Sequence, residues 1–450
     1  MRRVPPRGVV TLCVALCLPA ATWAQTPSTT TAPNVESASA ARAPMHAQAP
    51  TANGTASTQA LSLRQAIELA LTHNPDLAIA ALEVGANEGA RQQAGAYPNP
   101  EISWLQEDTQ RATRTTTLQL NLPIELGGKR AARVAAAERG FDIASEDLAA
   151  QRLEIRAAVT ARYFDTLAAQ ERVRVTDDAL ELAGRATRAA ALRVKAGKVA
   201  AIEETKASVA EAGVQVEASQ ARSDLRSAQA RLGALLGKIH PGTLMLDGQL
   251  DELPIAPSQE EAQQQVENSP ALRRARLEIE HRMALTELEK ARRIPDLTVS
   301  LGAKREEALG RNQAIVGVSI PLPLFDRNQG NLLEALKRED KAREALRSAR
   351  LQVAADALQA RERLESARME AGSLAAQVLP GAQSAYEAAV KGFELGKFSF
   401  LEALDAQRTL LQARMQYLRA TADAHRARAE LDRILGSADV EPKTSAPTTR

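Results

Sequence analysis

A near-repeat of about 200 residues organises this chain of 450 residues. Four punctuation points of the first half return in the second half at separations of 195–200 residues. The pairs are Asn74-Pro75 with Ser269-Pro270, Leu122-Pro123 with Leu322-Pro323, Gly197-Lys198 with Gly396-Lys397, and Gly237 with Gly436. Because such residues mark the ends of elements, their common spacing indicates a duplicated structural unit. We therefore expect the same order of helices and strands to occur twice.

The N-terminal segment 1–24 has the pattern of a secretory signal peptide. Three arginines precede an apolar stretch over 9–21, which is too short for a transmembrane helix. Both cysteines, Cys13 and Cys17, fall inside this segment, so the mature chain is expected to carry no disulfide and no thiolate ligand. A leucine precedes each cysteine, which disfavours acylation of the N-terminus.

The remaining chain divides by composition and by the repeat. Residues 25–60 and 438–450 are rich in small and polar residues and are expected to be a disordered leader and a disordered tail. The first repeat is predicted over 61–238, a connector over 239–257, and the second repeat over 258–437. The net charge of +2 argues against a nucleic-acid partner.

Each half contains two short segments in which apolar and polar residues alternate, as in a strand with one apolar face. The apolar positions are Ile102, Trp104, Leu118, Leu120, Leu122, Leu297, Val299, Leu301, Ala303, Val316, Val318, Ile320 and Leu322. Each segment spans roughly 8–11 residues, which is the length of a tilted strand that crosses a bilayer. We therefore predict four transmembrane strands per chain.

Long helical segments surround these strands. A helix over 63–95, interrupted at Asn74-Pro75, precedes the first pair. The segment 128–195 then lacks proline and carries apolar residues at heptad spacing, which predicts a helix about 100 Å long. A second helix returns over 200–236, and the second repeat matches both helices over 330–391 and 400–435.

The strands and helices together favour an assembly of several chains. Four strands leave two sheet edges, and unpaired backbone groups are costly in hydrocarbon. Two chains would supply eight strands, whose side chains fill the interior, whereas three supply twelve, roughly the smallest closed barrel with room for water. The long helices would continue this barrel as a tube. A secreted, soluble coiled-coil rod with short hairpins is the alternative at this point.

Three stretches resemble the TolC-like outer-membrane channels of tripartite efflux pumps. Residues 317–335, GVSIPLPLFDRNQGNLLEA, are similar to the cobalt–zinc–cadmium resistance branch. Residues 61–77, LSLRQAIELALTHNPDL, and residues 396–418, GKFSFLEALDAQRTLLQARMQYL, match the wider family. The resemblance extends over about 61–437. It implies a mainly α fold with transmembrane β: a homotrimer with a twelve-stranded barrel among outer-membrane lipids and a periplasmic α-helical barrel.

The same resemblance implies a function as the exit duct of an efflux system. Its partners would be a periplasmic adaptor (membrane fusion) protein and an inner-membrane RND pump, and its cargo heavy-metal cations. A drug-efflux duct or a type I secretion duct is the alternative within the family.

The resemblance also assigns roles to the two helix reversals. Gly197-Lys198 and Gly396-Lys397 are turns between antiparallel helices, and in this family such hairpins form the periplasmic tip that faces the adaptor. By position, Glu402 and Asp405 match the acidic residues that ring the closed tip, with Glu203 at the corresponding place in the first repeat. Solvated carboxylates on a helix face are the other interpretation.

Pro380-Gly381 interrupts the second long helix and has no counterpart in the first. Proline inside a helix removes a hydrogen bond and kinks the rod, so this position is predicted to be a hinge or a static bend. The sequence contains no catalytic motif and no cofactor motif. Glu278 and His281 have the spacing of a carboxylate metal site, but the second copy that such a site needs is missing. An enzyme is therefore not expected.

Overall fold

The computed structural model describes residues 60–238, 244–395 and 397–437. The predicted signal peptide, leader residues 25–59 and the predicted C-terminal tail lie outside the described residues, as does Gly396 of the second predicted turn.

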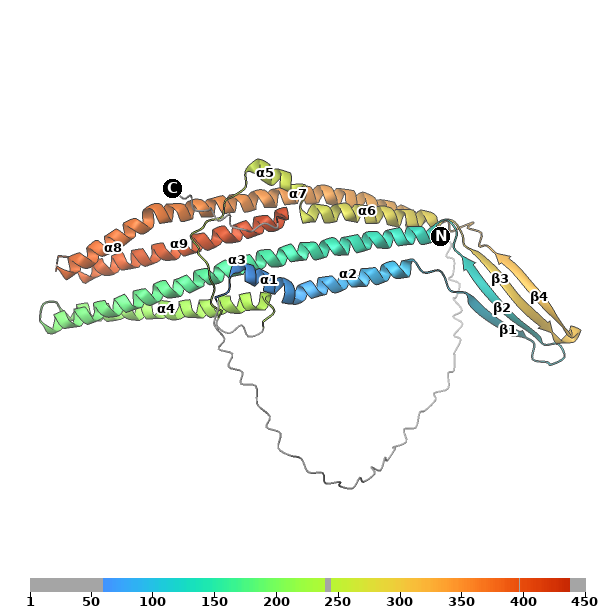
Figure 1. Ribbon diagram of the computed structural model, residues 1–450, viewed down its shortest axis with the longest axis horizontal. Helices are drawn as coiled ribbons and strands as arrows, with labels where there is room; N and C mark the ends of the chain where they lie inside the picture. Colours follow the sequence, from blue (N-terminus) through green and yellow to red (C-terminus); the bar gives the residue numbers. More distant parts are fainter. Residues whose placement is uncertain (1–59, 239–243, 396, 438–450) are drawn as a thin grey trace, which may run out of the picture. The chain divides into compact units, whose positions relative to one another are not determined.

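The first repeat contains two short helices, a strand pair and two long helices (Figure 1). Its elements are α1 (Leu63–His73), α2 (Pro75–Ala94), β1 (Glu101–Glu107), β2 (Thr115–Ile124), α3 (Lys129–Lys195) and α4 (Ala201–Leu235).

The second repeat returns the same order. Its elements are α5 (Gln259–Val266), α6 (Pro270–Ala291), β3 (Leu297–Glu306), the 3₁₀ turn η1 (Glu307–Leu309), β4 (Arg311–Ser319), α7 (Gln329–Ser373), the π-turn η2 (Leu374–Val378), α8 (Leu379–Glu394) and α9 (Phe400–Leu435). The predicted duplication of strand pairs and long helices is confirmed.

Equivalent residues cap equivalent helices in the two repeats. Asn74 accepts a hydrogen bond from the Asp76 amide at 2.8 Å where α2 begins, and Ser269 accepts one from the Leu272 amide at 3.4 Å where α6 begins. A proline follows each cap at a position whose missing N–H costs nothing in the first turn.

The junctions from strand to long helix also correspond. The N-cap of α3 is Gly128 with φ +74°, and the N-cap of α7 is Asn328 with φ +58°. Glycine and asparagine are the residues that adopt this left-handed conformation most readily. The side-chain amide of Asn328 also donates to the backbone carbonyl and to the carboxylate of Glu289, at 2.9 and 2.7 Å. α7 thus begins at Gln329, one residue before the helix start predicted at 330.

The four strands form one antiparallel sheet in the order β1-β2-β3-β4. Its register places the alternating apolar residues on one face, and these are Ile102, Trp104, Leu118, Leu120, Leu122, Val299, Leu301, Val316 and Val318. One boundary differs from the prediction, because β4 ends at Ser319, opposite Thr298. Ile320 and Leu322 lie beyond it, where the prolines at 321 and 323 have no N–H to donate to a ladder.

The helices pack mainly through small residues. α3 lies against α2, α4, α6 and α9, and α7 lies against α6 and α9. Among the described residues, alanine is the most frequent buried apolar residue, and examples are Ala66, Ala218, Ala357 and Ala424. Small side chains let long helices approach closely along their length, which suits a tube wall one helix thick.

Residues 244–257 of the predicted connector are tied to the helices of both repeats. Leu61 and Leu246 form a parallel bridge, and the Tyr163 hydroxyl of α3 donates to the Leu61 carbonyl at 2.9 Å. On the second repeat, Tyr417 bonds to Asp251 at 2.9 Å. The connector therefore crosses from α3 to α9 as a fixed part of the packing.

Candidate functional site

The first helix reversal ends α3 with a left-handed glycine. Gly197 has φ +69°, and the Lys198 amide donates to the Arg193 carbonyl at 2.9 Å. This hydrogen bond across the reversal is typical of a glycine-terminated helix end. Lys198 is exposed, so the turn presents a cationic side chain to solvent.

The second reversal repeats this hydrogen bond and adds another one. The amides of Lys397 and Phe398 both donate to the Gly392 carbonyl, at 2.8 and 3.2 Å. A Cβ on Gly392 would collide with the Phe398 ring, so only glycine leaves room for that ring. Gly392 was not identified from the sequence. Its signal would have been a glycine four residues before the predicted turn, inside a helical segment.

The two reversals contact each other within one chain. Both terminal nitrogens of Arg193 donate to the Phe393 carbonyl at 3.1 Å, and the guanidinium lies 4.2 Å from the centre of the Phe393 ring. Ala190 and Ala207 are buried beside Phe393 and Leu404. A hydrogen-bonded cation–π contact and a small apolar cluster therefore join the ends of the two hairpins.

The three predicted tip carboxylates have different surroundings. Glu402 completes a capping box, since its carboxylate accepts from the Ser399 amide at 2.6 Å while the Ser399 hydroxyl accepts from the Glu402 amide at 3.3 Å. Glu203 pairs with Lys206 at 3.0 Å. Asp405 is exposed. Among the described residues, no hydrogen bond or ion pair joins these carboxylates to one another.

The predicted interruption at Pro380-Gly381 is a π-turn in an otherwise continuous helix. In η2 the Leu379 amide donates to the Leu374 carbonyl, five residues back instead of four. Pro380 follows in the first turn of α8. In a regular helix the proline ring would clash with a backbone carbonyl of the preceding turn, and the missing N–H would leave one hydrogen bond unmade. The wider π-turn accommodates both effects.

The two faces of the sheet differ in chemistry. On the apolar face, Trp104 is 64% exposed and Val316 is 76% exposed within one chain. On the other face, Asn121 accepts hydrogen bonds from Ser300 at 2.7 Å and from Gln119 at 2.6 Å. One face is therefore suited to hydrocarbon and the other to water.

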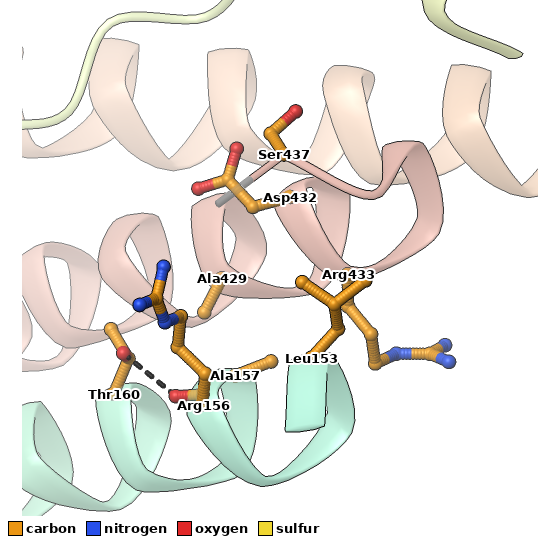
Figure 2. A pocket seen from close by; sticks show the side chains of 8 residues that line it. All are labelled: Leu153, Arg156, Ala157, Thr160, Ala429, Asp432, Arg433 and Ser437. Carbon is orange, nitrogen blue, oxygen red and sulfur yellow. Dashed lines mark hydrogen bonds between the residues drawn. The ribbon is translucent and has the colours of Figure 1, made fainter. Parts of the chain in front are cut away.

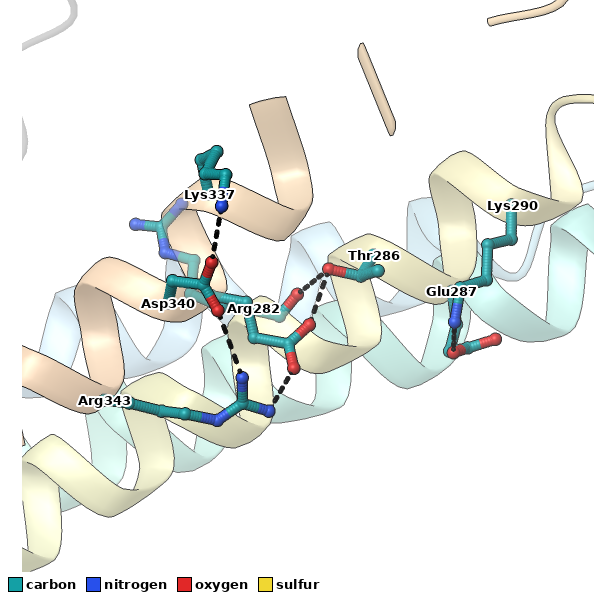
Figure 3. Close-up of polar contacts among 8 residues, drawn as sticks. Arg282, Thr286, Glu287, Lys290, Lys337, Asp340 and Arg343 are labelled. Atoms are coloured by element: carbon teal, nitrogen blue, oxygen red, sulfur yellow. Dashed lines mark hydrogen bonds and ion pairs between the residues drawn. The ribbon is translucent and has the colours of Figure 1, made fainter. Parts of the chain in front are cut away.

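Two buried carboxylates between the helices, Glu339 and Asp432, pair with nearby arginines. Glu339 of α7 accepts a hydrogen bond from Thr286 of α6 at 3.0 Å and pairs with Arg343, which also pairs with Asp340 (Figure 3). A pocket of about 10 Å³ lies between α3 and α9. Figure 2 shows the side chains that line it, Asp432 and Thr160 among them. Such a volume holds about one water. Burial raises the pKa of Asp432, and Arg428 opposes this shift.

The spacing of Glu278 and His281 does not build a metal centre. Glu278 pairs with Arg282 at 2.7 Å, and burial lowers the pKa of His281. Within the described residues, no group of three or more His, Cys, Asp or Glu side chains is arranged to hold a metal ion. In the same part of the chain, no helix is both long and apolar enough to cross a membrane.

Comparison with known proteins relates this geometry to a family. The outer membrane efflux protein family matches residues 66–238 and 262–437. The cobalt-zinc-cadmium resistance protein CzcC of Cupriavidus metallidurans is 45% identical over 376 residues, which are 84% of this chain and 90% of that protein.

Two solved structures share the fold. A membrane protein from Pseudomonas aeruginosa has a TM-score of 0.73 at 21% identity, and the match covers 83% of this chain and 92% of the other. The outer membrane protein VceC from Vibrio cholerae has a TM-score of 0.70 at 20% identity, and the match covers 83% and 96% of the two chains.

Proposed function

The chain belongs to the outer membrane efflux protein family, and from this premise we propose that it is the exit duct of a tripartite heavy-metal efflux system. It resides in the outer membrane, as predicted from the sequence resemblance. In our proposal, three copies conduct metal cations passively after an inner-membrane pump has delivered them through a periplasmic adaptor. The observation that carries this proposal is the sheet, with its exposed apolar face and its two open edges.

The open edges support assembly of several copies. Within the described residues, β1 and β4 each pair with a strand on one side only. In hydrocarbon their free N–H and C=O groups would be costly, and pairing β4 of one copy with β1 of the next removes both edges. Three copies give twelve strands, enough for a water-filled interior.

The helices beside the sheet support the same assembly. α2 packs on α3, α3 on α6 and α6 on α7, so α2 and α7 are the outer members of this row, like β1 and β4 in the sheet. Both present exposed apolar side chains, with Leu82 on α2 at 74% and Leu333 on α7 at 58%. Burying these residues against a neighbouring copy would remove apolar surface from water.

The proposed cargo follows from the relative and not from a binding site. CzcC is named for resistance to cobalt, zinc and cadmium, and its 45% identity spans most of both chains. Divalent heavy-metal cations are therefore the cargo that we propose. A duct that conducts ions passively needs a charged, hydrated path and does not need to coordinate its cargo.

The carboxylates at the hairpin ends are proposed to set cation selectivity. Glu402 and Asp405 are exposed on the first turns of α9, and three copies would bring six of these carboxylates to one opening. Because Glu402 also caps α9, Glu402→Gln is the informative change, since glutamine keeps the capping hydrogen bond and loses the charge. We expect Glu402→Gln with Asp405→Asn to weaken block by multivalent cations in single-channel recordings.

A matched control is available at the other end of the duct. Glu107 and Glu306 belong to the ends of β1 and β3, and neutralising both should leave block from the periplasmic side unchanged. Unchanged block in the tip variant would remove the proposed role of Glu402 and Asp405.

For the remaining predicted residues we propose two roles, contact with the adaptor and bending of the second hairpin. Gly197, Lys198 and Lys397 lie at the reversals and would meet the adaptor, as would Gly396, which lies outside the described residues. Pro380 and Gly381, next to the π-turn, would be the place where the second hairpin bends.

Deletion of the chain's gene in its host tests the whole proposal. We expect tolerance to cobalt, zinc and cadmium to fall and cell-associated metal to rise, with restoration by the intact gene. The purified protein should form trimers in detergent and conduct ions in a planar bilayer. Unchanged metal tolerance with lost drug tolerance would favour a drug duct, and a monomer without conductance would exclude the channel.

A further inference from the structure

The apolar face of the sheet ends at a defined level near the β1–β2 and β3–β4 turns. The last apolar row across the four strands is Trp104, Leu118, Ala303 and Ala314. The next row on the same face is polar and consists of Gln106, Thr116, Arg305 and Asn312. Tryptophan is enriched where hydrocarbon gives way to lipid headgroups. The row of Arg305 therefore lies at headgroup level on the lipid-facing side.

Three arginines belong to the strand ends and turns at this level: Arg111 and Arg114 between β1 and β2, and Arg305 near the end of β3. Arg305 pairs with the Glu307 carboxylate at 2.9 Å, and the Glu307 amide donates to the Arg114 carbonyl at 3.1 Å, which joins the two turns. The hydrogen bond from Arg305, and then the charges of Arg305, Arg114 and Arg111, lower the pKa of Glu307. The charges of three arginines thus act on one carboxylate, and only Arg305 pairs with it directly. Asp108, also in the first turn, accepts from the Gln110 amide at 3.0 Å.

We infer that Arg111, Arg114 and Arg305 form a docking surface for the phosphate groups of glycolipids in the outer leaflet. The inference rests on the proposed function, because it requires the sheet to be part of an outer-membrane barrel. The side chain of Arg305 is 59% exposed although it is paired, and Arg111 is exposed. Guanidinium groups bind phosphate through two parallel hydrogen bonds, and basic clusters at headgroup level bind anionic lipids.

The lipid is the occupant that the position favours. Arg305 stands in the row directly beyond the lipid-facing row of Trp104, so a headgroup phosphate reaches it without leaving the membrane surface. The opposite face offers a matched pair of cations at the same level. Lys304 pairs with Thr117, and Arg311 pairs with Glu306. Each is next in sequence to a residue of the lipid-facing rows and therefore lies on the opposite face of the sheet.

The test uses the full-length protein in phosphatidylcholine nanodiscs. A fluorescent bisphosphorylated lipid A is titrated into the discs, and dephosphorylated lipid A and inorganic phosphate serve as competitors. Each basic residue at a membrane surface contributes about fivefold in affinity. We therefore expect R114Q/R305Q to weaken lipid A binding by about 25-fold and added R111Q to weaken it further. K304Q/R311Q, which also removes two positive charges, should change it by less than about twofold.

The outcomes separate this surface from the duct itself. The inference is supported if only the lipid-facing pair loses affinity and if dephosphorylated lipid A competes poorly. Equal losses in both pairs, no loss in either, or full displacement by inorganic phosphate would overturn it. Conductance and trimer mass are measured on the same samples. A conducting trimer that does not bind lipid A overturns the inference alone, whereas a monomer without conductance overturns the duct as well.

Discussion

The two repeats share one order of elements but differ in how their long helices continue. α3 runs without a break for 67 residues. The corresponding segment of the second repeat is divided into 45 residues of α7, a π-turn of 5 residues and 16 residues of α8. Because the irregular turn occurs only in the second repeat, any bend based on it is confined to one hairpin of each chain.

The return helices differ as well. α9 starts with a capping box made by Ser399 and Glu402. The N-cap of α4 is Ala200, whose methyl group accepts no hydrogen bond, although Glu203 stands where a capping glutamate is needed. The start of α4 is therefore capped more weakly than the start of α9. The contacts between α3 and α4 hold α4 in place, so the two repeats keep the same geometry.

Arginine scanning of the apolar face tests whether both repeats contribute equally to the membrane surface. Leu120→Arg in β2 and Val318→Arg in β4 should each lower the free energy of unfolding by about 2–4 kcal/mol, because both place a charge in hydrocarbon. Asn121→Arg and Ser319→Arg, on the other face, should have little effect. Urea titrations of the protein in lipid vesicles measure the difference. A large effect in one repeat only would show that the two strand pairs lie at different depths.

Moving the proline between repeats tests the role of the π-turn. Glu181 of α3 stands 199 residues before Pro380 and is exposed. Glu181→Pro should lower the free energy of unfolding by about 3 kcal/mol, because α3 has no wider turn to accept the ring. Pro380→Ala should cost far less. Glu181→Ala is the control, and thermal unfolding in detergent is the measurement. Similar losses from Glu181→Pro and Pro380→Ala would contradict this view of the turn.

The second repeat has a buried histidine at a position where the first repeat has none, and this residue should make stability depend on pH. His425 of α9 stacks on Phe164 with ring centres 3.6 Å apart, and burial lowers its pKa to about 4. The residue 199 positions earlier is the exposed Arg226. Because the unfolded chain protonates this histidine near its ordinary pKa of about 6.5, stability is full above that pH and falls as the pH drops toward 4.

The expected loss from His425 is about 2–3 kcal/mol between pH 6.5 and pH 4. His425→Gln should remove this part of the pH dependence, because glutamine does not titrate. The difference between the two unfolding curves across this pH range is the measurement. Parallel curves for both proteins would mean that the imidazole has its ordinary pKa in the folded state.

Exchanging the N-cap residues of α4 and α9 tests the smallest of the differences between the two repeats. Ser399→Ala should destabilise the start of α9 by about 1 kcal/mol, and Ala200→Ser should stabilise the start of α4 by a similar amount, because Glu203 can then complete the box. Amide hydrogen exchange in the first turn of each helix reports both changes. No gain from Ala200→Ser would indicate that Lys206 holds Glu203 away from the cap.

Regular patterns explain which features could be predicted from the sequence. The alternation of Leu118, Leu120 and Leu122 and the long proline-free segments predicted the strands and helices, because their periods are local. The contact of Arg193 with Phe393 joins residues 200 positions apart, and no local pattern indicates it. The capping role of Glu402 was missed although Ser399 stands three residues before it, which is the sequence signature of a capping box. The end of β4 was misplaced because the apolar alternation continues through Pro321 and Pro323.

The nearly equal lengths of the two long helical segments restrict how this chain can gain or lose residues in evolution. One inserted residue moves everything beyond it by about 1.5 Å along the helix and turns it by about 100°. An insertion in α3 alone would carry Arg193 away from Phe393, and a matching insertion in α7 or α8 would bring the two ends level again. Insertions and deletions should therefore survive in pairs, one in each repeat, with whole turns preferred to single residues. The length of the long helical segment in one repeat therefore limits the length that the other repeat can adopt.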